Sequence, residues 1–274
     1  MPAAIEDYAL IGDCHTAALV GRDGGIDWLC LPRFDAPSTF GALLGTDDHG
    51  SWRLRPVGAT TCESRTYRDD SFVLETRWRT PDGEVEVIDL MPTRRRRTDV
   101  IRRVRGIRGT VRMRQELRIR FGYADALPWV RQIEERGARA LLAVAGPDSV
   151  IVRGPALAPE DHMHAGEFEV AAGETVDIVM TWFPSHQKPP KPLEVDNRIA
   201  ETEAWWHHWR GDPTAGDGDI PEYHDAVERS LLVLRALSDA DTGGIIAAAT
   251  TSLPEQVGGT RNWDYRYAWL RDAS

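Results

Sequence analysis

The C-terminal stretch Gly258–Ser274 carries side chains whose chemistry suits a sugar. It holds four aromatic residues, three arginines and two aspartates. A pyranose has an apolar face that stacks on Tyr or Trp rings, and a rim of hydroxyls that pairs with charged, bidentate hydrogen-bonding groups. Arg271 and Asp272 supply a donor fork and an acceptor, so the stretch predicts carbohydrate binding. The rings are those of Trp263, Tyr265, Tyr267 and Trp269.

Strands are the first elements that must position this stretch. Apolar or aromatic residues alternate with polar ones in four segments, and this period of two is typical of strands with one buried face. The segments are Ser51–Pro56, Phe72–Arg79, Val85–Leu90 and Val111–Phe121. Hairpin-turn sequences separate such runs at Asp23–Gly25, Pro81–Gly83 and Gly146–Asp148. Short strands joined by hairpins predict a mainly β fold, an antiparallel β-sandwich.

The pattern changes near residue 185. The proline-rich stretch Ser185–Pro192 ends the strand pattern, and Trp205, Trp206 and Trp209 then recur among charged residues at helical spacing. A glycine-rich connector follows at 211–219, and a second helix is expected from Pro221. We therefore expect a sandwich domain over 1–185, a linker helix with its connector over 186–218, and the start of a helical domain over 219–274.

Composition excludes several classes of protein. The formal charge of −10 argues against a nucleic-acid or anionic-membrane partner. No run approaches the roughly 20 apolar residues of a membrane helix, and the N-terminus lacks the basic and apolar regions of a secretion signal, so a cytoplasmic location is expected. Three cysteines without CxxC spacing predict buried thiols rather than disulfides or zinc ligands. The oligomeric state stays open.

Two motifs at opposite ends of the chain carry a family resemblance. Gly258–Asp272, with the sequence GGTRNWDYRYAWLRD, is similar to the opening of the catalytic domain in glycoside hydrolase family 15, the trehalase-like and glucoamylase-like enzymes. Ile5–Gly21 and Asp23–Ser38 resemble the start of the trehalase-like N-terminal domain in the same family. The order and spacing of these motifs extend the resemblance over the whole chain.

The resemblance implies a particular architecture, a β-sandwich followed by a linker helix and an (α/α)6 barrel. Twelve helices with their loops need on the order of 350 residues, so we expect only the first part of a barrel here and a C-terminally truncated chain. We also expect the apolar stretch Ile245–Pro254 to be buried in that barrel.

The resemblance also implies roles for the terminal residues. Tyr265 and Trp269 would wall the pocket for the first sugar, and Arg271 and Asp272 would hydrogen-bond hydroxyls of its non-reducing end. Inverting hydrolysis needs a general acid and a general base about 6.5 to 9.5 Å apart. The family places these two glutamates in later barrel loops, and Glu255 does not match their context. We therefore expect no catalytic residue and no cofactor in this chain, and an α-glucoside such as trehalose or a malto-oligosaccharide as the partner.

Several alternatives stay open. A non-catalytic carbohydrate-binding or scaffold protein would use the same aromatic residues. His162 and His164 beside Asp161, or Glu203 and His207, have spacings that could contribute metal ligands, although neither set has a third ligand at matching spacing. In the N-terminal motif we expect Trp28 and Phe34 to fill the sandwich core. A further hypothesis places the loop around Asp35–Ser38 against the barrel rim, where it would help to shape the sugar pocket.

Overall fold

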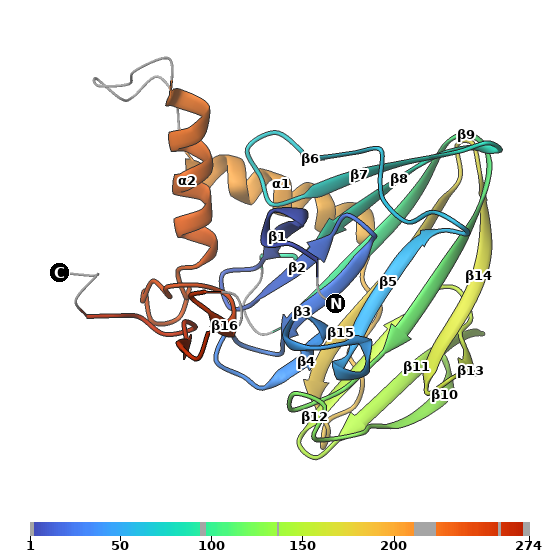
Figure 1. The fold of residues 1–274 in the computed structure, drawn as a ribbon. Helices are drawn as coiled ribbons and strands as arrows, with labels where there is room; N and C mark the ends of the chain where they lie inside the picture. Colours follow the sequence, from blue (N-terminus) through green and yellow to red (C-terminus); the bar gives the residue numbers. More distant parts are fainter. Residues whose placement is uncertain (1–2, 94–96, 136, 211–222, 257–258, 271–274) are drawn as a thin grey trace.

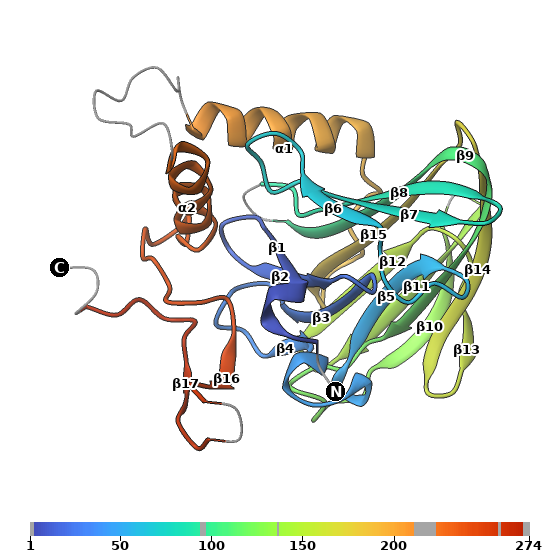
Figure 2. The same cartoon turned by 45° about the horizontal axis from the view of Figure 1, so that its top comes forward.

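The chain folds into a two-layered antiparallel β-sandwich with two helices beside it (Figures 1 and 2). The computed structural model describes residues 3–93, 97–135, 137–210, 223–256 and 259–270. Among these residues, neither helix has the length and apolar character that a bilayer crossing requires. The main sheet has 15 strands, and two further strands form a small separate sheet near the C-terminal end.

The elements follow one another along the chain in this order. The first strands are β1 (Tyr8–Gly12), β2 (Ala17–Gly21), β3 (Gly25–Cys30), β4 (Ser38–Phe40), β5 (Ser51–Pro56), β6 (Ser64–Tyr67), β7 (Leu74–Thr80) and β8 (Gly83–Leu90). The next are β9 (Thr98–Arg118), β10 (Trp129–Glu135), β11 (Ala138–Ala145), β12 (Asp148–Arg153), β13 (Ala158–Glu160), β14 (Met163–Ala171) and β15 (Thr175–Pro184). The helices are α1 (Val195–Arg210) and α2 (His224–Ala236), and the small sheet consists of β16 (Thr251–Pro254) and β17 (Asn262–Asp264).

Strand β9 joins the two layers because it pairs with different strands along its length. Residues 98–105 pair with β15 and residues 101–109 with β8, whereas residues 110–117 pair with β14 and 113–118 with β5. The change of partners falls at Gly106 to Gly109. A Cβ at Gly106 would lie 2.0 Å from the Ala171 carbonyl oxygen, so the crossing needs a residue without a side chain.

The sandwich core lies between the layers and is built from the alternating inward residues. Trp52 and Leu54 of β5 meet Val150 and Val152 of β12 and Met180 of β15 in one continuous apolar cluster. Each of these side chains is at most 4% exposed. The apolar residues that alternate along each strand are therefore buried together between the two layers, as expected for stacked sheets.

The C-terminal segment lies beside the N-terminal strands, and both views show the red segment next to the blue strands β1–β4 (Figures 1 and 2). Ile246 and Ala249 are buried in one cluster with Ala17 and Phe34. Trp206 of α1 and Leu232 of α2 are buried together with Cys14 and Phe72. The sandwich thus forms the platform on which the helices and the residues after them are assembled.

Most of the predicted strands are present, with boundary shifts. Ser51–Pro56 is β5 without change, and the three hairpin turns join β2 to β3, β7 to β8 and β11 to β12 as predicted. The segment Val111–Phe121 is only the second half of β9, because the Arg/Gly-rich residues before it continue the same strand. The three cysteines are free and buried, as predicted.

In the C-terminal part, one expectation was wrong and another concerns residues outside the described ranges. Helix α2 is described from His224 onward, and Pro221 and the connector 211–219 lie outside the described residues. The stretch Ile245–Pro254 was expected inside a barrel, and this was wrong for its middle, since Ile246 and Ala249 pack on the sandwich and 251–254 is β16. The described residues include two α-helices, and the barrel and the domain boundaries at 185 and 218 stay predictions.

Candidate functional site

The predicted sugar-binding stretch folds as a short ribbon. Strand β16 pairs antiparallel with β17, with Thr251 opposite Asp264 and Pro254 opposite Asn262. Before this pair, Ala248 N–H donates to Tyr265 O at 2.9 Å and Ala247 N–H to Tyr267 O at 3.2 Å. Residues 247–254 and 262–267 therefore run side by side, and the backbone on both sides of Arg266 is fixed by hydrogen bonds.

Two of the predicted sugar-binding residues come together. The rings of Tyr265 and Trp269 are parallel, with an interplanar angle of 3° and centroids 6.5 Å apart. Both side chains are half-buried, so their rings are held by the protein yet keep exposed surface. A fixed, flat aromatic surface of this kind suits the apolar face of a pyranose.

The other predicted residues of the stretch fall into two groups. Trp263 and Tyr267 are 54% and 51% exposed, so core packing does not account for either ring. Arg271 and Asp272 lie outside the described residues, and their hydrogen-bonding roles stay predictions. Glu255 is exposed, and its backbone N–H donates to the Arg261 carbonyl, which closes the ribbon.

Arg266 is a residue of this stretch for which the sequence analysis predicted no role. It is 6% exposed, and its guanidinium donates from Nε and Nη2 to the two carboxylate oxygens of Asp264, at 2.8 and 2.6 Å. Its Nη1 donates to the carbonyl oxygens of Ala36 at 2.6 Å and Phe34 at 3.2 Å. The Cys30 thiol is a weaker acceptor at 3.4 Å. One side chain thus ties the sugar-binding stretch to the N-terminal motif.

The electrostatics of this link follow from its geometry. The hydrogen bonds from Arg266 hold the pKa of Asp264 below its usual value, so this carboxylate stays charged. Burial raises the pKa of the Cys30 thiol to about 12, which keeps the acceptor neutral at physiological pH. The guanidinium therefore has one charged partner, and its other partners are neutral, namely the two carbonyls, the Cys30 thiol and the Tyr123 ring at 5.9 Å.

Two N-terminal residues complete the contact between sandwich and ribbon. Trp28 is fully buried, and its Nε1–H donates to Ala249 O at 2.7 Å. Phe34 is 4% exposed and packs on Ile246 and Ala249. Both rings are buried, as predicted. Phe34, however, lies at the contact with the C-terminal segment and not in the core between the two layers. No feature of the sequence alone pairs these positions with residues more than 200 places away.

The loop after β3 forms one wall of a small cavity of about 140 Å³. Arg33 and Asp35 form a bidentate pair there, with nitrogen to oxygen distances of 3.0 and 2.9 Å. Tyr267, Arg266 and Ile246 also line this cavity. Phe34 and Ala36 of this loop contact Arg266, and the hypothesis that the loop around Asp35–Ser38 lies against a barrel rim stays a prediction.

The polar residues at the start of the N-terminal motif have structural partners. Asp13 Oδ1 accepts from the backbone N–H groups of His15 and Thr16, both at 2.9 Å, and burial raises its pKa to about 6. Tyr8 donates to Asp27 Oδ2 at 2.7 Å, and burial raises the pKa of Asp27 as well. These carboxyls fix turns and strand edges.

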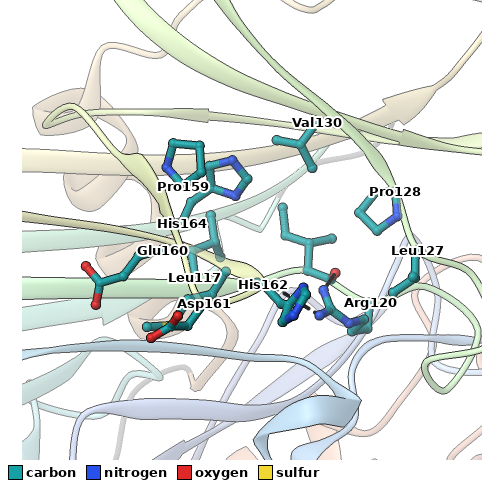
Figure 3. A pocket seen from close by; sticks show the side chains of 12 residues that line it. Leu117, Arg120, Leu127, Pro128, Val130, Pro159, Glu160, Asp161, His162 and His164 are labelled. Carbon is teal, nitrogen blue, oxygen red and sulfur yellow. Dashed lines mark hydrogen bonds between the residues drawn. The ribbon is translucent and has the colours of Figure 1, made fainter.

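A larger cavity of about 500 Å³ lies elsewhere in the sandwich, where the end of β9, the segment before β10 and the β13–β14 hairpin meet (Figure 3). Figure 3 shows Leu127, Pro128 and Val130 across the cavity from His164. Arg120 donates to the His162 carbonyl at 3.0 Å and belongs to its lining. Of the described residues that line this cavity, none is Tyr, Trp or Phe, so it lacks the aromatic rings predicted for a sugar-binding surface.

Metal binding finds no support in the described part of the chain. Within it, no three His, Cys, Asp or Glu side chains are grouped to hold a metal ion, and this includes His162 with His164 and Glu203 with His207. Glu203 instead accepts from Arg68 at 3.3 Å, which joins α1 to β6 and β7.

Comparison with known families gives two matches in sequence order. Residues 1–176 match the model of the trehalase-like N-terminal domain, and residues 221–274 match the model of glycosyl hydrolases family 15. The first match covers the sandwich up to the start of β15, and the second contains α2, the ribbon and the paired rings of Tyr265 and Trp269.

Curated relatives extend the match along the chain. A trehalase of Mycolicibacterium smegmatis is 32% identical over 300 residues, covering 98% of this chain and 43% of the relative. Trehalase 1 of Sulfolobus acidocaldarius is 31% identical over 272 residues, covering 98% of this chain and 44% of the relative. The chain therefore spans less than half the length of these relatives.

A solved structure shares the fold. The crystal structure of a bacterial glucoamylase complexed with acarbose superposes with a TM-score of 0.67 at 11% identity, covering 99% of this chain and 46% of that one. At this identity the likeness concerns the arrangement of the elements, and it extends over both the sandwich and the C-terminal ribbon.

Proposed function

Because this chain belongs to glycoside hydrolase family 15 and carries its trehalase-like N-terminal domain, we propose that it forms part of an α-glucoside hydrolase. Tyr265 and Trp269 bind the first glucose unit in this proposal. The observation that carries it is the parallel arrangement of their half-buried rings within the family match. Trehalose is the preferred substrate, since the relatives above are trehalases by name, and malto- or isomalto-oligosaccharide ends are the alternative.

The reaction in this proposal is inverting hydrolysis, carried out by two glutamates that lie beyond Ser274 in a complete family member. Arg271 and Asp272 would hold hydroxyls of the non-reducing glucose through charge-assisted hydrogen bonds. These 274 residues alone would then bind an α-glucoside without cleaving it.

Two measurements test the proposal. The coding sequence is read beyond codon 274, and the complete product is assayed for glucose release from trehalose, maltose and soluble starch. Glucose release from at least one of them is expected, and a product that cleaves none of the three contradicts the proposed reaction. A stop codon directly after 274 would favour the non-catalytic carbohydrate-binding alternative.

Binding is measured on the 274-residue chain by saturation-transfer NMR with trehalose and maltose, and with cellobiose as the β-linked control. Replacing Trp269 by Ala removes a stacking partner worth about 0.5–1.5 kcal/mol and weakens binding about three- to tenfold. Trp263→Ala is the matched control, because Trp263 lies in the same ribbon, is 54% exposed, and has no part in the ring pair. Unchanged binding in Trp269→Ala would remove Trp269 from the site.

A further inference from the structure

Arg266 occupies an unusual place for a buried charge. Its backbone lies between Tyr265 and Tyr267, and its side chain reaches main-chain carbonyls of the N-terminal motif. The residues that it links, Phe34 and Ala36, are 232 and 230 positions away in sequence. Burying an arginine lowers stability unless the N–H groups of its guanidinium find hydrogen-bond acceptors, so the buried Arg266 depends on this particular set of partners.

The hydrogen-bonding pattern uses the planar shape of the guanidinium. One edge, Nε and Nη2, binds both oxygens of Asp264, and the other end, Nη1, binds two main-chain carbonyls of the sandwich loop. Lysine has a single ammonium without a planar fork, so it cannot hold a carboxylate in bidentate geometry and also reach both carbonyls. The Arg266 side chain therefore fixes both the distance and the angle between the ribbon and the sandwich.

Both aromatic neighbours of Arg266 are tied to the same platform through the backbone. Tyr265 O accepts from Ala248, and Tyr267 O accepts from Ala247. The segment that contains these alanines is in turn held by Trp28 through the Ala249 carbonyl. Loss of the Arg266 contact would remove the direct hydrogen bonds between this segment and the carbonyls of Phe34 and Ala36, and a pair of strands as short as β16 and β17 is marginal in water without such support.

We propose that Arg266 is a positioning residue for the sugar site, and that the N-terminal sandwich is thereby an integral part of that site. The guanidinium holds Tyr265 and Trp269 in their parallel arrangement by fastening the ribbon to the carbonyls of Phe34 and Ala36. This inference rests on the proposed function for the identity of the ligand, an α-glucoside. The ring geometry itself does not depend on that function.

The test uses the 274-residue chain labelled with 5-fluorotryptophan and followed by fluorine NMR. The chain contains ten tryptophans, and Trp269→Phe identifies the Trp269 signal by its loss. In Arg266→Gln we expect the Trp269 signal to shift and broaden while the signals of Trp52 and Trp78, assigned in the same way, stay in place. These two rings are buried in the sandwich core and report that the fold is intact.

Two variants serve as comparisons. Arg261→Gln removes the same charge from an exposed arginine of the same ribbon and should leave the Trp269 signal where it is. Arg266→Lys keeps the charge without the fork, and its Trp269 signal should move in the direction seen for Arg266→Gln. If Arg266→Gln does not fold, Arg266→Lys takes its place, because it keeps the buried charge and changes only the planar fork, and an unmoved Trp269 signal in that variant overturns the positioning role.

A trehalose and maltose titration of each variant completes the test. We expect Arg266→Gln to bind about three- to tenfold more weakly than the unchanged chain, which is the loss expected for disturbed stacking. An unmoved Trp269 signal in a folded Arg266→Gln overturns the positioning role. If the unchanged chain binds neither sugar, the proposed function fails on its own, and the fluorine shifts still decide the role of Arg266.

Discussion

Arg102 and Asp89 form a buried ion pair, and we expect the loss of one partner to lower the free energy of unfolding strongly. The two side chains are 0% and 1% exposed, and Arg102 donates from Nε and Nη2 to the two Asp89 oxygens at 2.8 and 3.2 Å. It also donates to the carbonyls of Trp52 at 2.8 Å and Gly24 at 2.9 Å. The pair therefore connects β8 and β9 with β5 and the turn before β3.

Replacing Arg102 by Met leaves the Asp89 carboxylate buried without its partner. Removing one member of a buried pair costs about 3–5 kcal/mol, because the remaining charge stays out of water. For a chain of this size the loss corresponds to a Tm lower by roughly 6–20 °C. The double variant Arg102→Met with Asp89→Leu removes the stranded charge and should be at least about 2 kcal/mol more stable than Arg102→Met alone.

Urea unfolding followed by circular dichroism measures both free energies. Arg112→Met is the matched control, because Arg112 lies on the same strand β9 but its side chain is 63% exposed in its pair with Glu167. An exposed pair of this kind contributes no more than about 1 kcal/mol. The reasoning is refuted if Arg102→Met costs less than about 1 kcal/mol, or if the double variant is as unstable as the single one.

Three further outcomes are expected. Burial raises the pKa of Asp13 to about 6, so the folded chain keeps this proton between pH 4 and 6 whereas the unfolded chain loses it near 4. Stability should therefore fall by up to about 2–3 kcal/mol as the pH rises through this window, and urea melts of Asp13→Asn should lack that slope. Gly24→Ala should lower the free energy of unfolding by at least about 1–3 kcal/mol, because φ is +80° and the new Cβ would lie 2.3 Å from the Leu54 carbonyl oxygen. Gly58→Ala should lower it less in the same melts, because Gly58 has a similar φ of +79° but open space around the new Cβ. Phe34→Ala should open a cavity under residues 245–249 and speed amide hydrogen exchange there more than in the sandwich, and uniform acceleration would contradict this local role.

Part of the candidate site was accessible from the sequence. The residue types of 258–272 predicted a stacking surface, and the structure brings Tyr265 and Trp269 together as parallel rings. The role of Arg266 could not be predicted, although the residue stood within the motif. Its partners are main-chain carbonyls, which every residue has, so no side-chain pattern marks them.

Local sequence patterns were enough to identify several strands and hairpin turns. Alternation with a period of two is a local property, and hairpin turns depend on glycine and aspartate at fixed places, so β5 and the turn at 146–148 follow from neighbouring residues alone. The family motifs are local for the same reason. Tertiary structure decided where β9 changes layers, because the partners of a strand depend on the whole sheet. It also decided that Ile246 and Ala249 pack on Phe34 and that Arg266 reaches Ala36, since burial and hydrogen bonding between distant segments arise only when the chain has folded.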